Sequence, residues 1–243
     1  MVLKSKNFLA VIIPMYNEEK VADRCIKKVL HFLRSERRKC KLIVVDDGSN
    51  DKTQTILDKW GKNEKTFLSV IHHKKNKGYG GAIQTGIKEA IKNNYEYCLT
   101  MDSDLTNNPK YIHDFISEGV RGFDCIKASR YIKGSMVLNV PKYRVFISSV
   151  GNKLASFMFN VGITDCTNGF RMARVSMLKG LEFKQNNFSI ILEELYHLKS
   201  RGASFQEIPY TLTARSNSNS HFSYKPKVFY DYFKYAIMAI FLH

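Results

Sequence analysis

The sequence predicts an α/β fold with a mostly parallel central sheet flanked by helices. In the first half of the chain, four short apolar runs alternate with segments whose apolar residues recur every three or four positions. Strands separated by helices of this length are typical of parallel sheets. Polar clusters also follow three of the apolar runs directly, and ligands of such sheets bind at the carboxyl ends of the strands.

The first half is expected to contain four strands with three helices between them. The expected strands are Phe8–Ile13, Leu42–Val45, Phe67–Ile71 and Tyr97–Met101. The expected helices are Glu18–Arg34, Asp51–Trp60 and Gly80–Lys92. In the third of these helices, Ile83, Ile87 and Ile91 fall on one face, as core-facing residues of a helix do.

The second half is less regular. We expect a strand over Asp124–Ser129, a helix over Val145–Val161, a loop or strand over Cys166–Ala173, a helix over Ser189–Arg201 and a strand over Phe205–Thr213 broken at Pro209. The Ser- and Asn-rich stretch 215–224 is expected to be a loop. A helix with a broad apolar face follows over Val228–Leu242. The expected organisation is one domain over residues 1–224 and a C-terminal amphipathic helix over 225–243.

Composition narrows the protein class. An apolar share of 44% in 243 residues fits a globular domain with a full core. The five cysteines are odd in number and contain no CxxC pair, which favours reduced thiols in the cytosol over a disulfide scaffold or a zinc site. We expect no signal peptide and no spanning helix, since no apolar run approaches about 18 residues. The net charge of +16 favours anionic partners.

Two carboxylates one residue apart, Asp102 and Asp104, stand at the end of the fourth expected strand. Alternate side chains of a strand share a face, so both should reach the same small volume. Two adjacent anions repel each other unless a cation or a shared proton compensates them. Divalent ions bind carboxylate and phosphate oxygens together, so this segment predicts a metal–diphosphate site.

Two further polar clusters follow expected strands, Pro14–Glu18 and Asp46–Ser49. Taken singly, the first could merely begin a helix and the second could be an ordinary polar turn. Together with Asp102–Asp104 they predict one ligand site at the carboxyl edge of the sheet.

The chain resembles the family 2 glycosyltransferases, whose catalytic domain has the Rossmann-like GT-A fold. Four segments carry this resemblance in the order and spacing of the family: Val11–Glu18, Val44–Ser49, Asn76–Ala82 and Asp102–Asp104. The resemblance implies an inverting enzyme that takes a hexose from a nucleoside-diphosphate sugar such as GDP-mannose or UDP-glucose. Residues 1–224 would then be the catalytic domain.

The resemblance also implies roles for individual residues. The nucleotide sugar would be bound by Pro14, Tyr16, Asn17, Glu18, Asp46, Asp47, Gly78, Asp102 and Ser103. The carboxylate that matches Asp46 contacts the base or the ribose in the family. Asp102 and Asp104 would carry Mg²⁺ or Mn²⁺ on the diphosphate, and Asp104 also counts as a catalytic residue.

Three segments of the second half are similar to dolichyl- and polyprenyl-phosphate sugar synthases: Ala128–Tyr131, Thr167–Arg171 and Arg215 with its Ser-rich continuation. In these enzymes the residues that match Arg130, Arg144, Ser148 and Arg215 hold the phosphate of the lipid acceptor. A guanidinium group presents a fixed fork of donors that suits phosphate oxygens.

Few groups are candidates for acid–base chemistry. Arg130 is expected to be catalytic as well, and Asp165 is a candidate orienting or basic carboxylate. Glu193 and Glu194 are weaker candidates, and we expect one of them on a solvated helix face. A monophosphate acceptor, with a second pKa near ~6, arrives already anionic and needs positioning more than a base.

The chain departs from the pattern of the lipid-phosphate synthases at two positions. Thr106 stands where several mannose synthases have a glutamine in the metal shell, which leaves the third metal ligand open. His221, after Ser220, replaces a basic residue of the acceptor-phosphate motif.

The C-terminal segment bears on membrane association. Its helix could lie in the membrane interface, pack on the core, or be the stump of a longer chain. With the basic charge, we expect a peripheral enzyme at the cytoplasmic face of a membrane that takes its acceptor from the lipid surface. A homo-oligomer or a membrane-anchoring subunit is a further candidate partner.

Three other interpretations stay open. The acceptor could be a sugar hydroxyl in glycan synthesis, which would need a general base. Asp102–Thr106 also fits the DxDxT nucleophile motif of haloacid-dehalogenase-type phosphatases, although that motif usually follows the first strand. A basic nucleic-acid-binding protein would use the tyrosines and phenylalanines for stacking, but the basic residues form no dense stripe, so we expect no nucleic-acid partner.

Overall fold

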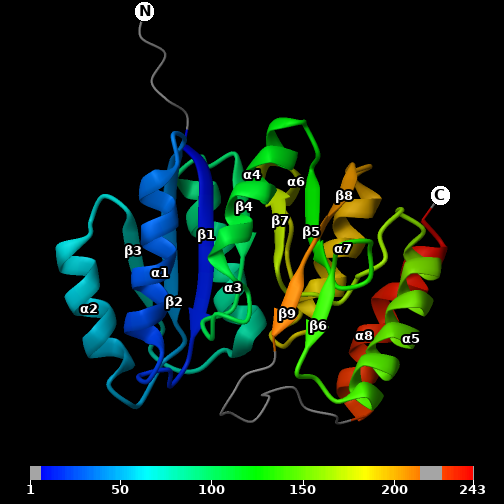
Figure 1. The fold of residues 1–243 in the computed structure, drawn as a ribbon, viewed down its shortest axis with the longest axis horizontal. Coiled ribbons are helices and arrows are strands. Elements are labelled where there is room, and N and C mark those ends of the chain that lie inside the picture. The colour runs from blue at the N-terminus through cyan, green and yellow to red at the C-terminus, as the bar shows by residue number, and fades with distance from the viewer. Residues whose placement is uncertain (1–6, 214–225, 243) are drawn as a thin grey trace, which may run out of the picture.

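A seven-stranded sheet divides the molecule into two helical layers (Figure 1). The structure, a computed structural model, describes residues 7–213 and 226–242. The strands of the sheet lie in the order β3 (Leu68–His72), β2 (Lys39–Asp46), β1 (Asn7–Met15), β4 (Tyr97–Thr100), β7 (Arg171–Arg174), β5 (Cys125–Ser129) and β8 (Phe205–Pro209). Two shorter strands, β6 (Met136–Leu138) and β9 (Thr211–Thr213), pair separately.

Most strand pairs are parallel. β1 pairs in parallel with β2 and β4, β2 with β3, and β5 with β8, whereas β7 runs antiparallel between β4 and β5. The predicted α/β class with a mostly parallel sheet is therefore confirmed. The chain continues from β1 to β2 on one side and reaches β4 on the other, so the carboxyl ends of β1 and β4 flank the crevice in which such sheets bind ligands.

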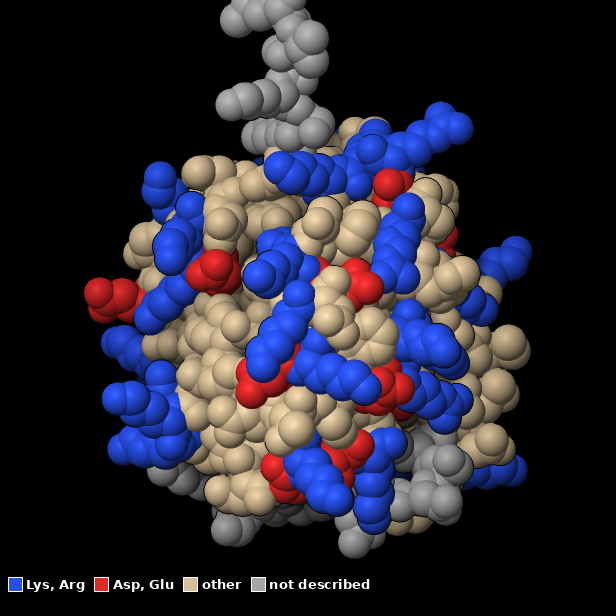
Figure 2. Space-filling model, turned by 90° about the vertical axis from the view of Figure 1, so that its left-hand side faces the viewer, with Lys and Arg blue, Asp and Glu red and all other residues tan. Residues whose placement is uncertain are grey.

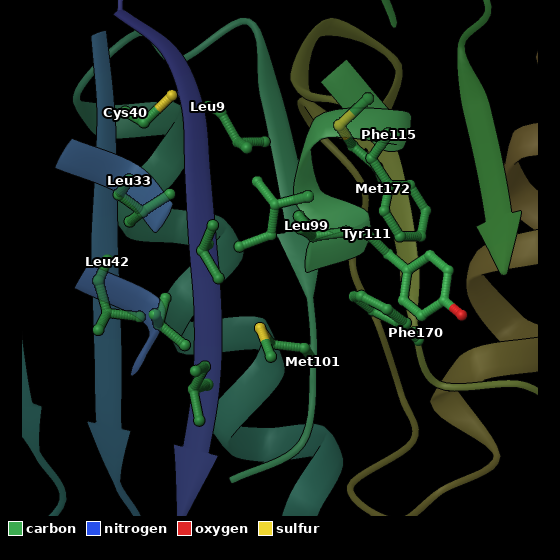
Figure 3. Packing of buried hydrophobic residues seen from close by; sticks show 14 of the residues in the cluster. Leu9, Leu33, Cys40, Leu42, Leu99, Met101, Tyr111, Phe115, Phe170 and Met172 are labelled. Atoms are coloured by element: carbon green, nitrogen blue, oxygen red, sulfur yellow. The ribbon is translucent and has the colours of Figure 1, made fainter. Parts of the chain in front are cut away.

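Helices cover both faces of the sheet. One apolar core joins it to α1 (Ala22–Ser35), α2 (Thr53–Asn63), the short η1 (Pro109–Tyr111) and α4 (Ile112–Val120). Figure 3 shows part of this core, to which α1 contributes Leu33, β4 contributes Leu99 and α4 contributes Phe115. A second core joins the other face to α3 (Gly78–Lys92), α6 (Val175–Leu178) and α7 (Ile190–Ser200).

Two helices, α5 (Lys142–Phe159) and α8 (Pro226–Ile240), lie side by side at the end of the molecule next to α7 (Figure 1). A third core joins them to α7 and includes Phe159, Leu195, Tyr235 and Ala239. Both helices were predicted, while α4 and the strand β6 were missed. Within the described ranges, no helix combines the length and the apolarity needed to cross a bilayer.

Basic side chains are distributed widely. Figure 2 shows the face at the α2 end, where Lys and Arg side chains are spread among Asp and Glu side chains. This face therefore offers a general attraction for anions.

The five cysteines are buried and carry free thiols. Burial raises the pKa of Cys25, Cys40, Cys125 and Cys166 to about 12, so their thiols stay protonated. Because the thiolate is the reactive form, we expect Ellman's reagent to label none of the five within minutes in the native protein. All five should react once guanidinium chloride unfolds the chain, and rapid labelling before unfolding would contradict the packing described above.

Candidate functional site

A cavity of about 540 Å³ opens at the carboxyl ends of β1 and β4, and we call it the donor cavity. Its lining combines the segments that the sequence singled out: Pro14, Tyr16, Glu18, Asp47, Gly78, Asp102, Ser103 and Asp104. The fold thus brings the three polar clusters and the glycine-rich segment together at one edge of the sheet.

The two carboxylates of the DxD segment reach this cavity from a turn. Because β4 ends at Thr100, the expected alternation along a strand does not place them, and that part of the argument was wrong. Asn107 Oδ1 accepts from the backbone N–H of Asp102 at 2.8 Å. Asp104 Oδ1 accepts from the backbone N–H and the hydroxyl of Thr106 at 2.9 and 2.7 Å. Thr106, in place of the expected glutamine, therefore orients Asp104.

Acidic side chains gather around the turn. The Ser103 hydroxyl, between the two aspartates, donates to Glu18 Oε1 at 3.1 Å. Burial raises the pKa of Cys25, and the negative charges of Asp104, Glu18 and Asp102 add to this rise.

A divalent cation fits this arrangement. The described residues hold no cluster of three or more His, Cys, Asp or Glu side chains that would bind a metal alone. Mg²⁺ is commonly bound by one or two carboxylates together with substrate phosphates. Asp102 and Asp104 line one cavity and supply hard oxygen ligands, so they would hold such an ion when a diphosphate provides the remaining ligands.

Other predicted nucleotide-site residues stabilise the rim of the cavity. Asp47, which is buried, accepts from His73 Nδ1 at 2.6 Å and from the backbone N–H groups of Lys77 and Gly78 at 2.9 and 2.8 Å. It therefore fixes the glycine-rich segment as well as lining the cavity.

Asp46 and Asn17 do not line the donor cavity. Asp46 is buried and contacts His72 Nδ1 at 2.8 Å and the backbone N–H of Ser49 at 3.1 Å. Asn17 has a left-handed backbone (φ 54°), and its Oδ1 accepts from the N–H of Asn50 at 2.8 Å. Both join the ends of neighbouring strands, and their contact with a nucleotide stays a prediction.

A second cavity, of about 830 Å³, adjoins the first along α5, and we call it the acceptor cavity. The two cavities share Tyr79, Asp102, Thr106, Val140, Arg144, Phe188 and Leu212. Its wall on α5 is mainly apolar and includes Ile147, Val150 and Leu154. Three of the four residues predicted to hold an acceptor phosphate, Arg130, Arg144 and Ser148, line this cavity. The fourth, Arg215, lies outside the described residues.

Arg130 is held by Asp165. Its Nε and Nη2 donate to the two carboxylate oxygens at 2.7 and 2.8 Å, and Nη2 also reaches the Thr167 hydroxyl at 3.2 Å. Burial lowers the pKa of Arg130, but the charge of Asp165 outweighs it and raises the pKa overall, so the guanidinium stays charged. Asp165 is fully buried and lines neither cavity. This geometry favours the orienting role predicted for Asp165 over the basic one.

Three features escaped the sequence analysis. Tyr79 and Phe188 line both cavities and stack on each other, with ring centroids 4.4 Å apart. Glu193 and Glu194 are both buried, so the expectation that one lies on a solvated face was wrong. The side chain of Glu194 forms a bidentate ion pair with Arg171 at 2.9 and 2.6 Å. Tyr79 stands within the glycine-rich segment Asn76–Ala82, whereas no motif marks Phe188.

Several characterised proteins are similar to this chain in sequence. A polyprenol monophosphomannose synthase from Mycolicibacterium smegmatis is 28% identical over 208 residues, which cover 84% of this chain and 77% of that protein. A dolichol-phosphate mannosyltransferase from Pyrococcus furiosus is 30% identical over 233 residues, which cover 93% of this chain and 62% of that protein. This chain thus spans less than two thirds of the archaeal relative.

Solved structures share the fold. Glucosyl-3-phosphoglycerate synthase from Mycobacterium tuberculosis, in complex with uridine diphosphate, matches 98% of this chain and 81% of its own with a TM-score of 0.68 at 15% identity. A structure of that synthase with Mn²⁺, uridine diphosphate and glucosyl-3-phosphoglycerate matches the same shares with a TM-score of 0.66 at 18% identity. At this level of identity the likeness concerns the fold alone, and it confirms the predicted GT-A architecture.

The family assignment rests on sequence over most of the domain. Residues 10–181, more than half of the chain, match the family model described as Glycosyl transferase family 2. This range includes all four segments on which the predicted resemblance was based, from the first strand to the DxD turn. The protein is therefore a glycosyltransferase that belongs to family 2.

Proposed function

We propose that the protein transfers a hexose, with inversion, from a nucleoside-diphosphate sugar to the phosphate of a polyprenyl or dolichyl phosphate at the cytoplasmic face of a membrane. One observation carries this proposal: an acceptor cavity with an apolar wall along α5 and the cations Arg130 and Arg144 adjoins the donor cavity. An isoprenoid chain suits such a wall, and its phosphate suits the guanidinium groups. The names of the relatives support the same acceptor class.

On the donor side, Asp102 and Asp104 would hold the divalent cation, Mg²⁺ or Mn²⁺. When bound, this ion supplies positive charge that compensates the nucleoside diphosphate as it leaves. Pro14, Tyr16 and Glu18 line the space next to it, where the nucleotide sugar is placed.

On the acceptor side, Arg130 and Arg144 orient the phosphate and reduce its repulsion from the diphosphate. At neutral pH most of a phosphomonoester with a second pKa near ~6 is already the dianion. One of its oxygens attacks the anomeric carbon, the bond from that carbon to the diphosphate oxygen breaks, and no proton has to be removed. This fits the position of Asp165, which holds Arg130 and lies outside both cavities.

Replacing Arg144 with Gln tests the acceptor site. Loss of one charge-assisted contact should raise the KM for polyprenyl phosphate by about tenfold or more. The KM for the nucleotide sugar should rise by less than the KM for the lipid phosphate, because Arg144 lines both cavities but Asp102 and Asp104 hold the diphosphate end. Steady-state kinetics with each substrate varied in turn would measure both constants.

The matched control is Arg121→Gln, which removes an exposed guanidinium at the C-terminal end of α4, where Arg121 contacts Glu118 at 3.0 Å. It should leave both constants unchanged. An Arg144→Gln enzyme with the wild-type KM for the lipid phosphate would argue against this acceptor site.

A surface that includes the α5 wall of the acceptor cavity supports the membrane location. Exposed apolar side chains recur every three or four residues along α5: Tyr143, Phe146, Ile147, Val150, Leu154 and Phe157. The adjacent helix α8 adds Ile237, Met238 and Ile240, and Phe241 follows directly after it. We call these ten residues the α5–α8 surface. Exposed basic residues, Lys142, Lys153 and Lys234, accompany it and would attract anionic lipid headgroups.

A single charge on this surface should weaken membrane binding. Phe157 is 81% exposed, so Phe157→Glu leaves the core intact while it opposes insertion into an anionic interface. We expect binding to phosphatidylglycerol-containing vesicles to fall by about threefold or more in co-sedimentation. Val120→Glu, at a 52% exposed position on α4, is the control and should bind as the wild type does. Equal binding of all three proteins would remove the α5–α8 surface from the proposal. Deletion of α8 is less informative, since it would uncover the third core.

A further inference from the structure

The segment that precedes α7, residues 184–189, lies directly against the glycine-rich segment of the donor cavity. The backbone N–H of Gly80 donates to the carbonyl of Asn186 at 2.9 Å. A Cβ atom at Gly78 would stand 2.3 Å from Asn186 O, and one at Gly80 would stand 2.4 Å from Gln185 O. Two backbones therefore touch with no room for a side chain, and a shift of one segment displaces the other.

The same segment forms the boundary between the two cavities. Phe188 belongs to it and stacks on Tyr79, with ring planes inclined by 22°. Both rings line the donor cavity and the acceptor cavity. The position of residues 184–189 thus sets both the glycine-rich wall of the donor cavity and the place where the two cavities meet.

A buried carboxylate holds this segment in place. Glu193, fully buried in α7, accepts from the backbone N–H groups of Lys184 and Gln185 at 2.8 and 2.9 Å. The hydroxyl of Tyr235 in α8 also donates to Glu193 Oε1 at 2.8 Å. A buried carboxylate is stable only when its oxygens are hydrogen-bonded, so the segment and α8 depend on the same group.

We infer that Glu193 and Tyr235 are positioning residues for nucleotide-sugar binding, through which the docked α8 holds residues 184–189 against the glycine-rich segment. The inference rests on the proposed donor cavity and is independent of the acceptor. Through this link, α8, a helix of the α5–α8 surface, affects the donor cavity. No motif in the sequence indicates such a link.

Tyr235→Phe tests the link, because it removes the hydroxyl and keeps the buried ring. We expect the dissociation constant for GDP-mannose or UDP-glucose, measured by calorimetry with Mn²⁺, to rise by about three- to tenfold for whichever sugar nucleotide the wild type binds. Glu193→Gln, which replaces one acceptor oxygen by an amide that faces a backbone N–H, should raise it further.

Lys199→Met is the matched control. Lys199 Nζ donates to the carbonyl of Ala239 at 2.7 Å, so this change also removes a bond between α7 and α8, but it does not touch residues 184–189. It should lower the melting temperature about as much as Tyr235→Phe and leave the dissociation constant unchanged. Wild-type affinity in Tyr235→Phe, or an equal loss in Lys199→Met, would overturn the inference. If the wild type binds neither sugar nucleotide, the proposed donor cavity itself is wrong and the inference falls with it.

Discussion

Replacing Asp104 with Asn is expected to abolish hexose transfer, with kcat reduced by at least about a thousandfold. Asp104 lines the donor cavity beside Asp102, and Thr106 orients it through two hydrogen bonds to Oδ1. Asparagine keeps the size of the side chain and removes its charge, so one of two anionic metal ligands is lost. Electrostatic compensation of a leaving diphosphate contributes several kcal/mol to catalysis, and each ~1.4 kcal/mol corresponds to about a factor of ten in rate.

Stability measurements separate this effect from misfolding. Asp104 is partly exposed and its hydrogen-bonding atom remains in Asn, so the free energy of unfolding should change by less than about 1 kcal/mol. Asp114→Asn, at an exposed position in the first turn of α4, is the control and should retain full activity. A well-folded Asp104→Asn enzyme with more than about a tenth of wild-type kcat would contradict the assignment of the DxD turn.

The second large effect concerns Asp165. Asp165→Asn should lower the free energy of unfolding by about 3 kcal/mol, because it leaves the largely buried charge of Arg130 without its counter-ion. The folded fraction should keep kcat within about tenfold of the wild type and show a raised KM for the acceptor. A raised KM with a nearly unchanged kcat is expected if Asp165 positions Arg130. Loss of a general base would instead lower kcat by about 10²–10⁴-fold.

A surface pair provides the comparison for stability. Glu118→Gln removes the partner of Arg121, whose side chain is 63% exposed, and should cost less than about 0.5 kcal/mol. Chemical denaturation of the three proteins measures these differences. An Asp165→Asn protein as stable as Glu118→Gln would show that the buried ion pair contributes little, and a loss of kcat alone would reinstate Asp165 as the base.

The first half of the fold was predictable because it repeats one unit. In each βαβ unit the buried strand is a short apolar run, and the helix that follows has one apolar stripe. Local sequence patterns are therefore sufficient to predict these elements. The antiparallel strand β7 was not clearly visible, since it begins and ends with the arginines Arg171 and Arg174 and owes its strand form to pairing with β4 and β5. In α5 the helix was predicted, but apolar residues occupy both of its faces, so the sequence does not reveal that Phe157 is exposed while Phe159 is buried.

The site was predictable where a motif marks it and not where tertiary contacts build it. The DxD aspartates and the glycine-rich segment do line one cavity. The carboxylate oxygens of Asp46, in contrast, are hydrogen-bonded to His72 and to the backbone N–H of Ser49. The contact with His72 depends on the pairing of β2 with β3. Phe188 lies in a segment that contacts Glu193 and the glycine-rich backbone, and neither contact can be read from the local sequence.

The proposed acceptor, a lipid phosphate, differs from the sugar hydroxyl of the alternative function. A sugar hydroxyl would need a base next to the anomeric carbon, and the carboxylate predicted for that role is occupied by Arg130. A phosphate acceptor needs cations and an apolar neighbourhood for its lipid, and the acceptor cavity provides both. The two possibilities therefore predict different products from the same donor.

The most direct measurement compares a polyprenyl phosphate with the polyprenol of the same chain length. The purified protein would receive Mn²⁺ or Mg²⁺ with radiolabelled GDP-mannose or UDP-glucose, and each lipid would be offered alone and beside a soluble sugar acceptor. We predict labelled lipid with the phosphate, none with the alcohol, and no need for the sugar acceptor. Product that requires a sugar hydroxyl, with none formed on the lipid phosphate, would contradict this prediction.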